Sequence, residues 1–189
     1  MSRRAVPRLH ALAVTLCAAW LGACSAPPQK ERDQAEGAVT AAKAADAAVY
    51  AQTELQSAVT SLVEYDRAVA QGDYRLALSH AISARDAAYL AARVAGERKA
   101  AARSEAERLI VDFEGQVMVA RSRLGGSPPA LSPPVAKRTR TTVNTAPKRL
   151  QEARSLLEKQ DYKGVVALLQ ATVQTLRKDL ATPGGRRGK

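Results

Sequence analysis

The amino-acid sequence predicts an all-α protein, in which a long antiparallel, coiled-coil-like helical hairpin is followed by a linker and a second, short helical hairpin. Apolar residues recur at alternating steps of three and four along most of the chain, which is the spacing of one face of a helix. Most of those positions hold alanine, the strongest helix former, in a chain that is 46% hydrophobic but only 4% aromatic. Glycine and proline interrupt the pattern at two main places, near Gly72 and after Leu124.

The first helix of the long hairpin is expected to start near Asp33 and to end at Gly72. A narrow apolar seam predicts one continuous helix up to this glycine. The seam consists of Ala38, Ala41, Ala45, Ala48, Gln52, Leu55, Val59, Leu62 and Val69. After the glycine, the side chain of Asp73 can cap the next helix, with Tyr74 in its first turn.

The second helix is expected to reach Leu124 and to pack against the first, so that residues 33–124 form one hairpin. Its seam is pure alanine at first and gains larger residues later. The members are Ala77, Ala81, Ala84, Ala88, Ala91, Ala95, Ala102, Ala106, Leu109, Phe113, Val117, Ala120 and Leu124. Alanine lets two helix backbones approach closely, and a glycine turn permits the antiparallel reversal.

The rear of the chain begins with a predicted linker over residues 125–144, because its paired prolines favour an extended chain. The linker ends in a basic stretch that contains Lys137, Arg138 and Arg140, which is expected to be unstructured. Helical periodicity returns in the short hairpin over residues 145–181, with Pro147 in a first turn. Residues 182–189 are expected to form a disordered basic tail.

The two hairpins share a turn sequence. Gly72-Asp73-Tyr74 aligns with Gln160-Asp161-Tyr162 at a constant offset, and the flanking apolar residues align as well. Each Asp is predicted to cap a helix, and each Tyr can pack across the junction. The turn resembles that of tetratricopeptide-like hairpins, although two units are too few for a solenoid. True duplication and convergence on favourable turn chemistry both account for the match.

The start of the chain has the layout of an export signal over residues 1–23. Arg3, Arg4 and Arg8 precede a short apolar stretch that ends at Leu21-Gly22-Ala23-Cys24. This ending resembles the lipobox of bacterial lipoproteins. The resemblance implies cleavage between Ala23 and Cys24 and a diacylglycerol on the Cys24 thiol, with residues 24–32 as a tether. The alternative is an ordinary secretory signal in which the cysteine is incidental.

The same resemblance implies a cellular location. Two or three acyl chains on one cysteine hold a protein at a bilayer effectively permanently. Ser25 follows the cysteine, and in Gram-negative members of the family a residue other than Asp at this place indicates the outer membrane. We therefore expect a membrane-anchored protein of the bacterial cell envelope that faces the periplasm. Its only attached groups are expected to be the acyl chains on Cys24, with no cofactor or metal.

Composition argues against catalysis. After removal of the signal, His80 is the single histidine and Cys24 the single cysteine, and no phosphate loop or nucleophile elbow occurs. Few aromatic residues remain to line a substrate pocket. We expect a protein that is not an enzyme.

Charge is concentrated in the rear of the chain. Residues 24–123 hold thirteen Lys and Arg against fourteen Asp and Glu, a net charge of −1, whereas residues 124–189 hold thirteen against four, a net charge of +9. The basic rear is expected to contact an anionic envelope polymer or lipid headgroups, or else to be a solvated tail. The candidate contact residues are Lys137, Arg138, Arg140, Arg186, Arg187 and Lys189. Nucleic acid is not expected as a partner, because the export signal directs the chain out of the cytoplasm.

The front half, from Gln34 to about Arg108, resembles small bacterial lipoproteins with an Ala-rich helical-hairpin domain of unknown function. The residues that carry this resemblance are the lipobox, the alanine seams and the turn at Gly72. It implies an envelope setting and supplies no catalytic residues. We expect a structural or scaffolding protein, or alternatively an adaptor that binds an envelope protein through the short hairpin. A homodimer through the alanine seams stays open.

The lipid anchor yields a direct prediction. Replacing the cysteine, Cys24→Ser, is expected to abolish lipid attachment and to leave the chain uncut or soluble, because the acceptor sulfur is lost. Metabolic labelling with a radioactive fatty acid measures this. Label retained by the Cys24→Ser variant would disprove the anchor site.

Overall fold

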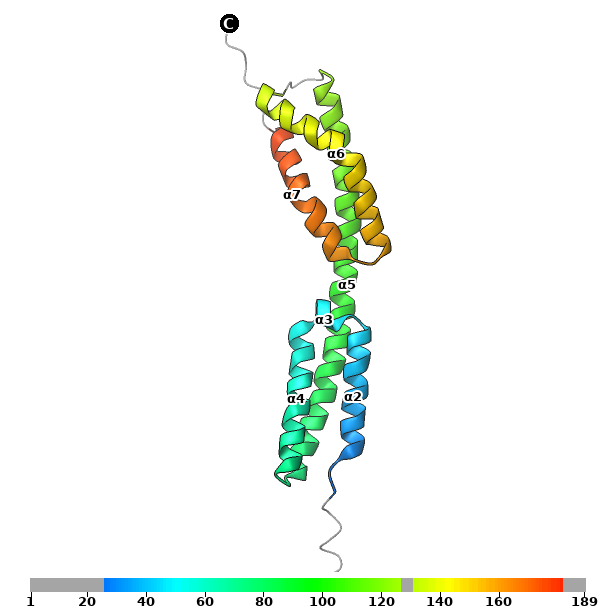
Figure 1. The fold of residues 1–189 in the computed structure, drawn as a ribbon, viewed down its shortest axis with the longest axis vertical. Coiled ribbons are helices and arrows are strands. Elements are labelled where there is room, and N and C mark those ends of the chain that lie inside the picture. Colours follow the sequence, from blue (N-terminus) through cyan, green and yellow to red (C-terminus); the bar gives the residue numbers. More distant parts are fainter. Residues whose placement is uncertain (1–25, 127–130, 182–189) are drawn as a thin grey trace, which may run out of the picture. The chain divides into compact units, whose positions relative to one another are not determined.

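The computed structural model describes residues 26–126 and 131–181, and every regular element in them is α-helical (Figure 1). The all-α prediction is thereby confirmed. The helices are α2 (Gln29–Ala44), α3 (Ala47–Tyr50), α4 (Gln52–Ala70), α5 (Tyr74–Leu124), α6 (Pro133–Glu158) and α7 (Tyr162–Ala181). The predicted cleavage and lipidation residues Ala23 and Cys24, and the tail residues Arg186, Arg187 and Lys189, lie outside the described residues.

The chain divides into two compact units, with the boundary between Gly96 and Glu97. Helix α5 crosses this boundary and contributes its first part to unit 1 and its second part to unit 2. The predicted single hairpin over residues 33–124 is therefore split between two units.

Unit 1 is a bundle of α2, α4 and the first part of α5, with an up-down-up course (Figure 1). The prediction of one helix from Asp33 to the glycine turn is wrong. Helix α2 ends at Ala44, Asp46 adopts the left-handed conformation with φ 61°, and Ala51, with φ −140° and ψ 45°, lies outside the helical conformation. The short α3 lies between these two breaks, and the chain reverses there.

The break changes which residues of the first seam face the core. The predicted seam members Ala41, Ala48 and Gln52 are exposed. The buried residues are instead Ala35, Ala38, Val39, Ala42, Ala47, Tyr50, Ala51, Leu55, Ala58, Tyr65 and Ala68. A reversal at residues 45–51 gives α2 and α4 separate inward faces, so one continuous period cannot describe both.

The seam of α5 in unit 1 is buried as predicted. Its six alanines from Ala77 to Ala95 each have 0% exposed surface. Tyr65 packs with Ala68, Ala77 and Ala81, and it is the largest fully buried side chain. The Tyr65 hydroxyl has no hydrogen-bond partner among the described residues. Burial raises the pKa of Tyr65, and the guanidinium of Arg32, 6.0 Å from the ring centre, acts in the opposite direction.

Unit 2 combines the second part of α5 with α6 and α7. Its largest fully buried side chains are Phe113, Leu169, Leu176, Val165, Val173 and Thr139, whereas in unit 1 Tyr65 is the one side chain of this group. The core of unit 2 is therefore built from larger residues and is conventional. Two ion pairs, Arg154–Glu114 and Arg177–Asp112, each of 2.6 Å, connect α6 and α7 to α5. The short hairpin predicted from the sequence is therefore part of a three-helix bundle.

The predicted linker over residues 125–144 is shorter than expected. Helix α6 already begins at Pro133, with two prolines in its first turn, and Thr139 is fully buried within it. Proline is favourable there because the first helical N–H groups have no partner within the helix. The prediction that residues 137–142 are unstructured is therefore wrong.

Helix α6 continues through Pro147, which the sequence placed in a first turn. A proline inside a helix lacks the N–H that would bond to the carbonyl four residues earlier, and its ring clashes with that turn. Figure 1 shows α6 bent near its middle. We attribute this bend to Pro147.

The shared turn has the same hydrogen bonds in both units. In unit 1, the N–H of Asp73 donates to the Ala68 carbonyl (3.0 Å), and the N–H of Gly72 donates to the Val69 carbonyl (3.0 Å). The aligned pairs in unit 2 are Asp161 to Leu156 (2.9 Å) and Gln160 to Leu157 (3.0 Å). Both are Schellman C-caps with a left-handed residue, Gly72 at φ 74° and Gln160 at φ 59°.

Mutation of the alanine seam tests the core of unit 1. Ala84→Glu is expected to destabilise this unit by ~3 kcal/mol or more, because it places an unpaired carboxylate where no space exists. Thermal unfolding followed by circular dichroism measures the change. Ser83→Glu is the matched control, since Ser83 is exposed on the same helix. An equal unfolding temperature for the Ala84→Glu and Ser83→Glu variants would show that the alanine seam is not a packing interface.

The left-handed turn residues give a reciprocal test. Gln160→Gly is expected to stabilise the protein by about 0.5–1 kcal/mol, because glycine adopts positive φ without strain, even though the side-chain bond from Lys99 to Gln160 is lost. Gly72→Gln is expected to destabilise it by a similar amount. Urea unfolding reports both changes. A destabilising Gln160→Gly would contradict the strain argument.

Candidate functional site

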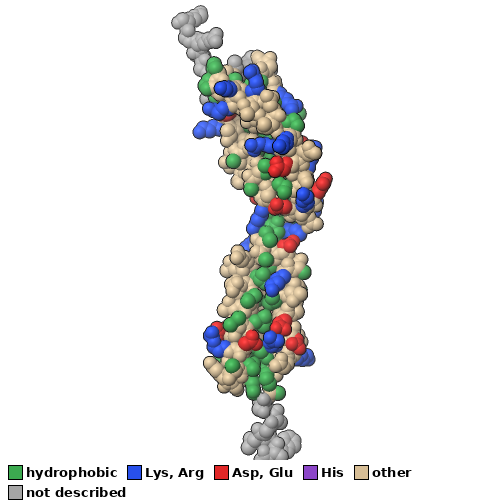
Figure 2. All heavy atoms as spheres, in the orientation of Figure 1, with side chains coloured by type: hydrophobic (Ala, Val, Ile, Leu, Met, Phe, Trp, Pro, Cys, Tyr) green, Lys and Arg blue, Asp and Glu red, His purple; other side chains and the backbone are tan. Residues whose placement is uncertain are grey.

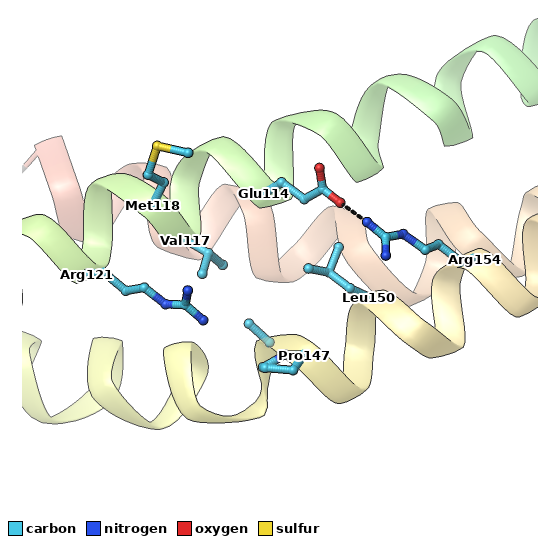
Figure 3. Close-up of a pocket in the computed structure, with 8 residues that line it drawn as sticks. Glu114, Val117, Met118, Arg121, Pro147, Leu150 and Arg154 are labelled. Atoms are coloured by element: carbon cyan, nitrogen blue, oxygen red, sulfur yellow. Dashed lines mark hydrogen bonds and ion pairs between the residues drawn. The ribbon is translucent and has the colours of Figure 1, made fainter.

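An open groove of about 500 Å³ lies between α5 and α6 in unit 2, beside the bend at Pro147 (Figure 3). Its apolar wall includes Val117 and Ala146, which are buried, and Leu150, which is half-buried. Met118 lies on the rim with 72% of its surface exposed. Pro147 lies on the α6 side of the groove, across from Val117 and Arg121 of α5 (Figure 3).

Charged side chains stand at the two ends of the groove. At one end Arg154 donates to a carboxylate oxygen of Glu114 at 2.6 Å, so this cation is already neutralised. At the other end Arg121 extends towards Pro147 (Figure 3). Arg121 forms no ion pair with any residue of the described ranges. An apolar wall next to an unpaired guanidinium suits a ligand that carries an anionic group beside apolar atoms.

A basic surface occupies the first part of α6. Between Pro133 and Gln151 the helix holds five cations and no carboxylate. Lys137, Arg140 and Lys148 are exposed, and no hydrogen bond or ion pair is found for their charged side-chain groups within residues 26–126 and 131–181. We call these three residues the α6 basic face. Blue side chains are visible over this part of unit 2 in Figure 2.

The other two cations on this part of α6 bind to side chains of α7. Arg138 donates to Asp179 of α7 at 2.8 Å, and only 9% of the Asp179 side chain is exposed. The hydrogen bond and the charge of this carboxylate raise the pKa of Arg138. Arg149 donates to the Thr172 hydroxyl at 2.7 Å. Arg138, predicted as an anion contact, is therefore committed to an internal ion pair.

The predicted turn residues act as caps. Asp73 accepts a hydrogen bond from the Leu76 N–H, and Asp161 accepts one from the Gly164 N–H, both at 2.9 Å. Tyr162 is buried beside its turn, whereas Tyr74 is half-buried. These contacts position helices, and the turns lie apart from the groove residues in the sequence.

Sequence reasoning did not find the groove. Its residues come from two helices that only the three-helix packing of unit 2 brings together. Pro147 was the available signal, because an internal proline bends a helix and opens the packing beside it. The sequence pattern alone predicts a first helical turn at this residue instead.

Comparison of the chain with protein-family models, with curated proteins and with solved structures finds no match. Within residues 26–126 and 131–181, no group of three or more His, Cys, Asp or Glu side chains is arranged to hold a metal ion. In the same ranges no helix combines the length and the apolarity that crossing a membrane requires.

Proposed function

We propose that this protein is a membrane-anchored envelope lipoprotein that acts as a non-catalytic scaffold, and that the α6 basic face contacts an anionic surface. The lipobox-like ending at Cys24 supports the anchor. The proposed contact rests on one observation. The stretch of α6 from Pro133 to Gln151 contains no carboxylate, and the charged groups of three exposed cations in it have no partner among the described residues.

The charge of unit 2 favours the same proposal. Its described residues hold sixteen Lys and Arg against nine Asp and Glu, a net charge of +7. The described residues of unit 1 hold seven against nine, a net charge of −2. Each cation near an anionic bilayer contributes about 1 kcal/mol, and salt screens this attraction. An anionic envelope surface would thus attract unit 2 and leave unit 1 free for other contacts.

A charge-reversal variant tests the basic face. Lys137→Glu/Arg140→Glu/Lys148→Glu is expected to weaken binding to phosphatidylglycerol vesicles by about a hundredfold or more at low salt, since three contacts of ~1 kcal/mol each become repulsive. Co-sedimentation measures the binding, in a Cys24→Ser background that removes the anchor.

The matched control is Lys30→Glu/Lys43→Glu/Arg75→Glu, which makes the same change in net charge at exposed positions of unit 1. The control is expected to retain most of the binding. Equal loss in both variants would mean that total charge, and not the α6 basic face, determines binding. Unchanged binding in the α6 variant would refute the proposed contact.

The alternative function is an adaptor that binds a protein partner, and the groove between α5 and α6 favours it. Deleting the short hairpin is not a clean test, because α6 and α7 cover Phe113 on α5. A point change on the rim, Met118→Glu, spares the core, since Met118 is mostly exposed. Loss of one specific cross-linked protein in cells, with vesicle binding intact, would support the adaptor over the surface contact.

A further inference from the structure

The exposed face of α5 in unit 1 carries large apolar side chains, while the buried face carries alanine. Leu78, Ile82 and Tyr89 expose 36%, 38% and 59% of their surface. Their spacing of four and seven residues places them in one row along the helix. Figure 2 shows hydrophobic side chains gathered along the viewed face of unit 1, over α5. Apolar side chains gathered in one exposed row are typical of a contact surface.

Two opposite charges interrupt this row at its centre. Arg85 and Asp86 are sequence neighbours and pair with each other at 2.9 Å, with 33% and 60% of their side chains exposed. The pattern around them is symmetric along the chain. Ile82 and Tyr89 lie equally far from the Arg85–Asp86 bond, and so do Leu78 and Arg93.

From this pattern we propose that the row is the interface between two copies of this chain, paired antiparallel about a two-fold axis through the Arg85–Asp86 bond. In this arrangement Arg85 faces the partner's Asp86, and Asp86 faces the partner's Arg85. Ile82 packs against the partner's Tyr89, and Leu78 packs along the aliphatic part of the partner's Arg93. Each contact occurs twice, as a two-fold interface requires.

The charges at the centre of the row indicate that its partner is a second copy of this chain and that the two α5 helices run antiparallel. An antiparallel pair brings opposite charges together at the centre of the row, whereas a parallel pair in register would place Arg85 beside the partner's Arg85. The alanine seams cannot form this interface, because every alanine of the α5 seam in unit 1 is already covered within its own chain. The homodimer through those seams, which the sequence left open, is therefore replaced by one through the opposite charges and the exposed row.

A mixing experiment tests the pairing with the full chain purified in detergent. Sedimentation velocity is expected to show a dimer for the unmodified chain at micromolar concentration. Arg85→Glu leaves only acidic groups at the centre, and Asp86→Arg leaves only basic ones. Each variant alone is expected to self-associate at least tenfold more weakly, because like charges then meet twice.

An equimolar mixture of the two variants is expected to restore the dimer as a heterodimer, which two different affinity tags detect. The internal Arg85–Asp86 pair is broken in both variants, so only pairing between chains explains the rescue. Lys43→Glu, on an exposed site of α2, is the control and should not alter association. A monomer at about 100 µM, a dimer that neither variant weakens, or a mixture without rescue would each overturn the proposal. Circular dichroism verifies that every variant is folded.

Discussion

Close helix packing through alanine is the constraint on which unit 1 depends. Six alanines of α5 have no exposed surface, and their small side chains set the distance between this helix and α4. Each alanine buries little area, so the unit gains stability from many short contacts and few large ones. Tyr65 is the largest fully buried side chain in this core, and its hydroxyl lacks a partner among the described residues. The large apolar residues of α5 consequently lie outside this core and are available for contact with other molecules.

The two units share one turn geometry although their cores contain residues of different size. Both turns use the same Schellman bonds, a left-handed residue and an aspartate cap, at aligned positions. The helices that follow bury alanine in unit 1 but Val165, Leu169 and Val173 in unit 2. The geometry of the turn is thus independent of the size of the packed residues. This agreement is compatible with duplication and with convergence alike.

The alanine seam of α5 and both turns were predictable from the sequence, because periodicity and cap chemistry act locally. The break between α2 and α4 was not, since no glycine or proline marks it, and Asp46 adopts the positive φ that few residues other than glycine take up. The start of α6 could not be predicted either, because residues that are typical of a linker form a helix there. Four prolines and a basic run look like a linker, yet Thr139 is fully buried and Arg138 pairs with Asp179 of α7. The groove depends on this same long-range packing, so only the three-dimensional structure reveals it.

The separation of small interior residues from large exterior ones has an evolutionary consequence. At the covered alanines, a larger residue has no room and glycine weakens the helix, so the interior of unit 1 tolerates few substitutions. Leu78, Ile82 and Tyr89 lie outside that interior, so we expect their replacement to disturb the bundle less than a change at the alanines. Selection could therefore change the specificity of the outer face, residue by residue, at a smaller cost in folding than changes in the interior would have.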